Sequence, residues 1–180
     1  MNSDHTQHLL VLTILSRLLF SVLLISSSSF TLFDSSPNII TNSIWSSPLL
    51  RWDVFHFAHI AENGYVYEHE WAFFPGTPLI MRFTAEVVRF VNGSPGPLNW
   101  DHLLLGGALA AVGCDTTRTL YHLSLHHLGS PSLALMASLL SLIPHSPVTL
   151  RFAPYAEPFF TYLSYKGECH LYELLILLRQ

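Results

Sequence analysis

The residues whose types suit chemistry concentrate in one stretch, Leu50–Pro78, which is rich at once in aromatic, acidic and histidine side chains. Asp53, its first carboxylate, could act as a general base that removes the proton of a sugar hydroxyl while that hydroxyl attacks an activated sugar phosphate. The plainer interpretation is an exposed acid in the first turn of a helix, where a negative charge favours the helix dipole. From the residues alone, the two interpretations are about equally well supported.

Two histidines, His56 and His59, follow Asp53 at intervals of three residues. On a helix these three side chains turn by about 120° in total, which is poor geometry for one metal ion without further ligands. The stretch has no HExxH-type spacing, so a metal site is the minority interpretation and none is predicted. We expect His56 to donate a hydrogen bond to a sugar or phosphate group instead.

Acidic and aromatic side chains are interleaved in the residues that follow. Carboxylates bind sugar hydroxyls and aromatic faces pack against sugar C–H groups, so the combination suits a carbohydrate site. For each residue taken alone, the stronger interpretation is an aromatic belt with solvated acids at a membrane surface. The members are Glu62, Tyr65, Tyr67, Glu68, His69, Glu70 and Trp71.

A second polar loop, Arg151–Pro158, is framed by prolines and carries Glu157. This carboxylate could orient a substrate, or it could begin a helix after a proline turn. Arg51, Arg82 and Arg151 are candidates to hold a lipid phosphate, because guanidinium groups suit phosphate oxygens. Each could instead be an interfacial arginine whose charge reaches the headgroups.

The composition places these loops beside a membrane. Half of the 180 residues are hydrophobic and only 11% are charged, whereas soluble domains carry about 25% charged residues. The net charge is −4 with eight Lys and Arg, which gives no basic face, so nucleic acid is not an expected partner. The two cysteines, Cys114 and Cys169, lie in apolar segments and are expected to be unpaired.

Apolar segments supply the spans that would hold the loops. Leu9–Phe33 is long enough to cross a bilayer, although Arg17 within it must face other helices or an aqueous cavity. An uncleaved anchor is favoured over a cleaved signal peptide, because the residues before this segment carry no Lys or Arg. Leu98–Leu125 and Ser132–Leu150 are the further predicted spans.

Two helices are expected between the first and second spans. The apolar spacing after Leu50 predicts a helix that ends near Asn63. Leu79–Val91 is short and amphipathic, with three charged residues along one face, which indicates a helix lying flat at the membrane surface. If this helix lies flat while the three apolar spans cross, the loops around Asp53 and Glu157 face the same side.

Two local patterns concern the later spans. Small residues at four-residue spacing in Leu98–Leu125, such as Gly106 and Ala110, predict close packing by another helix. The apolar character of Phe159–Leu178 is interrupted by the charges of Lys166–His170, and a clean membrane span would not carry those charges at mid-length.

The sequence WD-x-x-H-[FW]-x-x-IAE-x-GY, followed by YEH and FFPG-x-P, resembles the first lumenal loop of the PIG-V family, the second mannosyltransferase of GPI-anchor synthesis. A second segment, Ala153–Phe160 (APYAEPFF), is similar to that family's Y-[SA]-E-x-x-F segment. The residues that match the first loop are Trp52, Asp53, His56, Phe57, Ile60, Ala61, Glu62, Gly64, Tyr65, Tyr67, Glu68, His69, Phe73, Phe74, Pro75, Gly76 and Pro78.

The resemblance implies an all-α integral membrane protein of the endoplasmic reticulum, a multi-pass GT-C-like helical bundle whose long first lumenal loop carries amphipathic helices. On this interpretation residues 1–33 form the first transmembrane helix. Residues 34–97 form the lumenal loop with the catalytic-type motif and the interfacial helix. Residues 98–180 form further transmembrane helices and the second lumenal loop, corresponding to the N-terminal part of a family member.

The implied reaction transfers mannose from dolichyl-phosphate mannose to the 6-hydroxyl of the first mannose of a GPI precursor, giving an α-1,6 linkage with inversion at the donor carbon. No cofactor is implied beyond this donor substrate. Asp53 is the expected general base. The expected substrate-binding residues are Trp52, His56, Glu62, Tyr65, Glu68, His69, Arg151 and Glu157. The expected partners are the GPI lipid precursor, the donor and the membrane. An accessory endoplasmic-reticulum membrane subunit is a further candidate partner.

Two other hypotheses stay open. Family members are much longer, so the chain could be a truncated, non-catalytic membrane protein of the same family that retains the loop. The third hypothesis is a secreted soluble protein after signal cleavage. The apolar runs Leu103–Gly113 and Leu133–Ile143 argue against it, because they would remain exposed to water.

Overall fold

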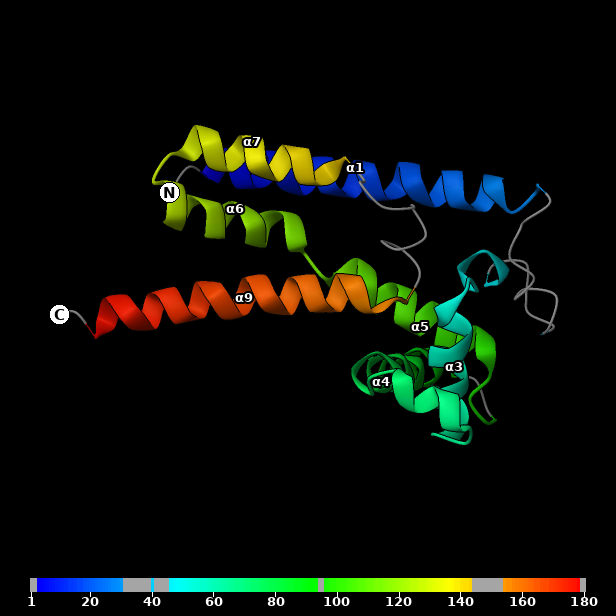
Figure 1. The fold of residues 1–180 in the computed structure, drawn as a ribbon. Coiled ribbons are helices and arrows are strands. Elements are labelled where there is room, and N and C mark those ends of the chain that lie inside the picture. Colours follow the sequence, from blue (N-terminus) through cyan, green and yellow to red (C-terminus); the bar gives the residue numbers. More distant parts are fainter. Residues whose placement is uncertain (1–2, 31–39, 41–45, 94–95, 144–153, 179–180) are drawn as a thin grey trace.

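The computed structural model describes residues 3–30, 40, 46–93, 96–143 and 154–178, and every element assigned within them is helical (Figure 1). The predicted all-α fold class is therefore confirmed. The α-helices are α1 (Ser3–Ser27), α3 (Asp53–Asn63), α4 (Gly76–Val91), α5 (Trp100–Gly113), α6 (Thr116–Leu128), α7 (Pro131–Leu142) and α9 (Ala156–Leu177). Two short 3-10 helices are η1 (Ser47–Leu49) and η2 (Glu68–Ala72).

Helix α1 contains the segment His5–Ser27, the one candidate membrane span that length and composition identify within the described residues. Most of its large apolar side chains are exposed, as expected of a surface that lipid would cover. Arg17 donates hydrogen bonds to the Val112 carbonyl and, at 2.7 Å, to the Cys114 carbonyl. The expectation that this arginine faces another helix is confirmed. Its guanidinium donates to carbonyls that the C-terminal end of α5 leaves without partners inside the helix.

Helices α1, α6, α7 and α9 lie side by side, with α6 antiparallel to α7 (Figure 1). A small buried cluster of Leu9, Tyr121 and Ala134 joins α1, α6 and α7. A tight connection follows α6: Gly129 adopts the left-handed conformation that ends the helix, with φ 62°. The side chain of Ser130 then caps the first turn of α7.

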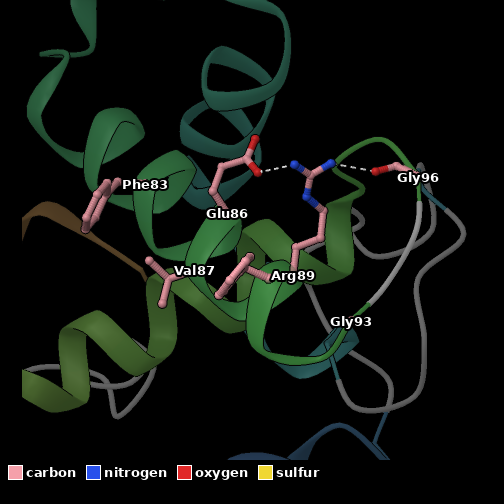
Figure 2. A pocket seen from close by; sticks show the side chains of 7 residues that line it. Phe83, Glu86, Val87, Arg89, Gly93 and Gly96 are labelled. Atoms are coloured by element: carbon pink, nitrogen blue, oxygen red, sulfur yellow. Dashed lines mark hydrogen bonds and ion pairs between the residues drawn. The ribbon is translucent and has the colours of Figure 1, made fainter.

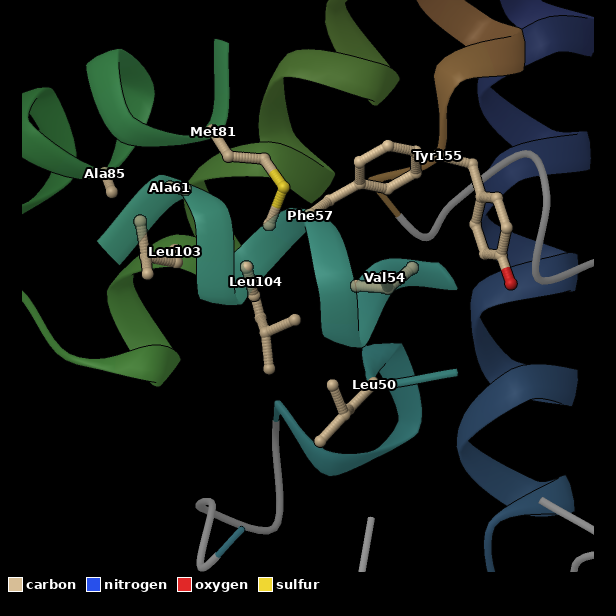
Figure 3. Packing of buried hydrophobic residues seen from close by; sticks show 10 residues of the cluster. Leu50, Val54, Phe57, Ala61, Met81, Ala85, Leu103, Leu104 and Tyr155 are labelled. Atoms are coloured by element: carbon tan, nitrogen blue, oxygen red, sulfur yellow. The ribbon is translucent and has the colours of Figure 1, made fainter. Parts of the chain in front are cut away.

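The second packing unit consists of α3, α4 and α5, which surround the main hydrophobic core (Figure 3). Glycine makes their close approach possible: a Cβ atom on Gly106 would lie 2.6 Å from the Ala85 nitrogen of α4. A Cβ atom on Gly107 would lie 2.5 Å from the Pro154 side chain. The prediction that small residues of α5 permit close packing is confirmed. The core side chains are Leu50, Val54, Phe57, Ala58, Ala61, Met81, Ala85, Leu103, Leu104 and Tyr155.

The predicted continuous span Leu98–Leu125 is wrong, because the chain forms two helices there. Helix α5 ends at Gly113, and α6 begins at Thr116. Between them Asp115 acts as the N-cap, with its side chain accepting from the Arg118 amide at 3.2 Å, which favours a new helix start over continuation. Asp115 also pairs with the Arg118 guanidinium, as the three-residue spacing allows.

Among the described residues α9 is not a candidate membrane span, which agrees with the expectation that the charges of Lys166–His170 interrupt its apolar character, although the helix itself runs unbroken through them. The charged side chains of this segment are exposed, so they cost the helix little. The Lys166 ammonium lies 5.9 Å from the centre of the Tyr162 ring, one turn earlier. For the predicted span Ser132–Leu150, the structure describes helix Pro131–Leu142, and residues 144–150 lie outside the described part.

Candidate functional site

The site is built at the N-terminal end of α3, where Asp53 occupies the first turn and is exposed. The buried side chains of Leu50 and Val54 anchor the backbone on either side of it. Trp52 between them has φ 40° and ψ −117°, and its side chain is 53% exposed. A positive φ is uncommon for a bulky residue and costs free energy, so the surrounding contacts must hold Trp52 in this conformation.

The second polar loop reaches this point through Tyr155. Its hydroxyl donates to the Arg51 carbonyl at 3.1 Å, and this bond is buried. The tyrosine ring also meets Phe57 of α3 edge-on, with 6.4 Å between centroids. Glu157 follows two residues later and is exposed in the first turn of α9, a position that fits the helix-start alternative and also leaves the carboxylate open to a substrate. The two segments singled out from the sequence therefore meet beside Asp53.

Glu70 fastens the following loop onto α3. One carboxylate oxygen accepts from the Val66 and Tyr67 amides at 2.9 and 3.0 Å, and the other lies 2.5 Å from Nδ1 of His59. Burial on its own raises the pKa of Glu70, but the hydrogen bonds from Tyr67, Val66 and His59 outweigh it and lower the pKa below its ordinary value. The carboxylate is therefore held ionised as a structural clasp.

The rings around His56 form a partly enclosed cluster. Its imidazole stacks on Phe73 with 4.8 Å between centroids and meets His69 edge-on at 5.4 Å. Burial lowers the pKa of His56 below its ordinary value, and His69 lowers it further, while Asp53 acts in the opposite direction. The imidazole is thus neutral at neutral pH and able to share a hydrogen bond with an uncharged hydroxyl.

Two predicted substrate-binding residues have structural partners. Glu62 accepts from the Trp100 indole nitrogen at 2.9 Å, which ties α3 to α5. The Tyr65 hydroxyl donates to the Phe73 carbonyl at 2.7 Å, and its ring stacks on Trp71 with 4.7 Å between centroids. These contacts fix the loop surface and leave Trp71 exposed on it.

The remaining candidates fall into three groups. Glu68 and His69 are exposed on η2, and the ring of His69 stacks on Tyr67. Arg151 lies outside the described residues. Of the arginines considered for a lipid phosphate, Arg51 is buried, and Arg82 donates to the Ala61 carbonyl at 3.3 Å. Within the described part of the chain, no group of three or more His, Cys, Asp or Glu residues is placed to hold a metal ion.

Sequence reasoning did not single out three residues that shape the site: Tyr155, Glu70 as a clasp, and Trp100. Tyr155 stood inside the second motif, and its position between two prolines was the available signal. The partners of Glu70 and Trp100 lie 11 and 38 residues away along the chain, and no local pattern indicates them.

Comparison with known proteins matches residues 7–174 to the family described as Mannosyltransferase (PIG-V). GPI mannosyltransferase 2 of Cryptococcus neoformans is 38% identical over 161 residues, which cover 88% of this chain and 35% of the relative. GPI alpha-1,6-mannosyltransferase 2 of Cricetulus griseus is 37% identical over 129 residues, covering 66% of this chain and 24% of the relative. The Homo sapiens protein of the same name is 35% identical over 130 residues, with the same coverage. The chain thus spans about a third or less of the length of these relatives. No solved structure matches it.

Proposed function

Because the chain belongs to the PIG-V mannosyltransferase family, we propose that it carries the catalytic loop of a GPI mannosyltransferase in the endoplasmic reticulum membrane. The proposed reaction moves the second mannose from dolichyl-phosphate mannose onto the GPI precursor and forms an α-1,6 linkage. The relatives' names support this reaction, since they include GPI alpha-1,6-mannosyltransferase 2.

The observation that carries the proposal is the contact between the two motif segments beside Asp53. The Tyr155 hydroxyl donates to the Arg51 carbonyl and so joins the start of α9 to the start of α3, and the acids of the two segments, Asp53 and Glu157, are both exposed. The nearby carboxylates Glu62 and Glu70 accept hydrogen bonds from protein groups, whereas Asp53 is exposed at the helix start. Of the two carboxylates of α3, Asp53 is therefore the one that is exposed to a substrate.

In the proposed mechanism Asp53 removes the proton from the 6-hydroxyl of the acceptor mannose while that oxygen attacks the donor C1. The bond between C1 and the phosphate oxygen breaks, and dolichyl phosphate leaves with the bonding electrons as a phosphate anion. No acid catalyst is required, because this leaving group already carries charge. Neutral His56 and the exposed rings of Trp52 and His69 would orient the sugars by hydrogen bonds and stacking. Tyr65, Glu68 and Glu157, with Arg151, complete the proposed substrate-binding set.

A multi-pass, GT-C-like arrangement with α4 at the membrane surface is part of the same proposal. Helix α4 buries Met81 and Ala85 against the core, while Phe83, Val87 and Phe90 stand exposed on another side (Figure 2). Beside them, the Arg89 guanidinium pairs with Glu86 at 2.5 Å and donates to the Gly96 carbonyl at 2.6 Å. An exposed apolar stripe with charged groups along its edge suits a helix that lies in the membrane interface.

Complementation tests the proposal. Cells that lack the second GPI mannosyltransferase would receive this chain or its Asp53→Ala variant, and surface GPI-anchored protein would be measured by flow cytometry. Rescue by the parent chain and its loss with Asp53→Ala is the expected result. No rescue by a chain that is present in the membrane would favour the alternative, a non-catalytic family fragment. This alternative is tested because the chain covers at most about 36% of the length of each of these relatives.

A further inference from the structure

The hydroxyl of Tyr155 is placed against the backbone that carries the proposed catalytic base. We propose that Tyr155 is a positioning residue of the transferase, which fixes Trp52 and Asp53 through the carbonyl of Arg51. The inference rests on the proposed function and adds to it a residue that touches no substrate. In the reaction, Tyr155 would keep Asp53 where its carboxylate can reach the acceptor hydroxyl.

The tyrosine is itself held from several directions. Its side chain is only 4% exposed and belongs to the main core (Figure 3). The preceding Pro154 is buried so closely against α5 that no side chain larger than that of Gly107 would fit opposite it. On the other side, Phe57 of α3 meets the tyrosine ring edge-on. The position of the hydroxyl is therefore set by the packing of α3 and α5.

The acceptor of this hydrogen bond, the Arg51 carbonyl, lies directly before Trp52 and Asp53 in the chain. The Arg51 carbonyl accepts from the Val54 amide at 2.9 Å and from the Tyr155 hydroxyl at 3.1 Å. This carbonyl thus links the first turn of α3 to the residue that precedes α9. Trp52 and Asp53 lie in the chain between Arg51 and Val54, which the first of these bonds joins. Trp52 has φ 40°, a conformation that persists only where its surroundings fix it. Loss of the tyrosine hydroxyl would release one of the contacts that define this short segment.

A purely structural role would be a buried hydrogen bond that stabilises the fold and nothing else. The two roles differ in kcat per folded molecule. A misplaced base lowers the rate of the chemical step while substrate binding is largely kept, so kcat falls and KM changes little. A loss of fold stability lowers the amount of active protein without selectively loosening the backbone at Trp52 and Asp53.

The test compares Tyr155→Phe with Tyr121→Phe in the full chain purified in detergent. Tyr121 is a matched control, because it is 2% exposed and its hydroxyl lies 3.3 Å from Nδ1 of His5, in the cluster that joins α1, α6 and α7. Both substitutions remove one oxygen and keep the ring. Amide hydrogen exchange across residues 51–58 and steady-state mannosyl transfer from dolichyl-phosphate mannose are the two measurements.

We expect Tyr155→Phe to speed exchange at Val54 and Phe55 and to lower kcat by about 10- to 100-fold, with KM for the donor within about twofold. Tyr121→Phe should leave both properties at the parent values. Unchanged exchange at Val54 and Phe55, or a kcat equal to that of Tyr121→Phe, would overturn the proposal. If the parent chain itself transfers no mannose, the proposed function fails for this chain, and the exchange measurement alone decides whether Tyr155 fixes the Asp53 segment.

Discussion

His59 Nδ1 lies 2.5 Å from Oε1 of Glu70, a carboxylate that is only 1% exposed, and this contact closes the loop after α3 back onto the helix. The other carboxylate oxygen accepts two backbone amides of the same loop. Three hydrogen bonds to one buried acid therefore define the surface that presents the exposed aromatic rings of η2. The proposed substrate surface depends on a residue that does not itself face the substrate.

Replacement of Glu70 by Gln should open this loop. The glutamine carbonyl is uncharged and accepts the Val66 and Tyr67 amides more weakly than the carboxylate does, so Glu70→Gln loosens the clasp while keeping its volume. Limited proteolysis and amide exchange of residues 64–72 should both become faster than in the parent. Glu68→Gln is the control, because Glu68 is exposed on the same turn. Equal protection of the loop in the two variants would show that Glu70 is not the clasp.

The clasp should also respond to acid in a defined direction. The pKa of Glu70 is lowered below its ordinary value of 4.5 in the folded chain. A carboxylate of this kind contributes stability that is fully present above its ordinary pKa and is lost as the pH falls through the lowered folded value. Loop exchange in the parent, corrected for intrinsic rates, should therefore be constant above pH 4.5 and rise below it. Glu70→Gln should lack this transition, and a transition of the same size in that variant would assign it to another group.

Contact between α5 and α4 should make Gly106 intolerant of even one added carbon. A Cβ atom there would lie 2.6 Å from the Ala85 nitrogen, a backbone atom that cannot move aside cheaply. Gly106→Ala is expected to destabilise the chain by about 1–3 kcal/mol, measured by thermal unfolding in detergent. Gly113→Ala, on the same helix, would meet nothing within 4 Å and should leave stability unchanged or slightly raised. Similar losses in both variants would contradict the packing described for α4 and α5.

Substitutions of Glu62 can show whether this carboxylate holds the structure together or binds a substrate. Its oxygen accepts from the Trp100 indole at 2.9 Å, and a glutamine can accept the same bond. If holding Trp100 is its role, Glu62→Gln should keep mannosyl transfer within about twofold, whereas Glu62→Ala should lose both activity and thermal stability. A loss of transfer in Glu62→Gln with stability intact would instead return Glu62 to the substrate-binding set.

The sequence predicted local features well and long-range contacts poorly. The start of α3 near Asp53, its end at Asn63 and the amphipathic α4 follow from short-range spacing and stop signals, and the structure confirms them. The break at Cys114–Asp115 was missed because a window of apolar residues does not register a two-residue break that an N-cap makes favourable. The charges of Lys166–His170 interrupt the apolar character of α9 as expected, yet they do not end the helix, because charges on an exposed side of a helix cost little.

Within the site, Asp53 was identifiable from its residue type and from the motif around it. Its setting was not, because the bond between Tyr155 and Arg51 joins positions 104 residues apart. The conformation of Trp52 likewise depends on tertiary contacts, since tryptophan has no local preference for a positive φ. The role of Asp53 as a general base stays a prediction, as do the roles of the expected substrate-binding residues.

Direct measurement of mannosyl transfer by an Asp53→Asn variant tests the central claim most directly. Microsomes from cells that lack the endogenous second GPI mannosyltransferase would supply the acceptor, with radiolabelled dolichyl-phosphate mannose as donor. Asp101→Asn is the control, because Asp101 occupies the first turn of α5 as Asp53 occupies that of α3, and the asparagine carbonyl can still accept the hydrogen bond from the Ser46 hydroxyl. The account predicts a loss of at least about 100-fold for Asp53→Asn and a change within about twofold for Asp101→Asn. Transfer by Asp53→Asn at the parent rate would contradict the assignment of Asp53 as the base.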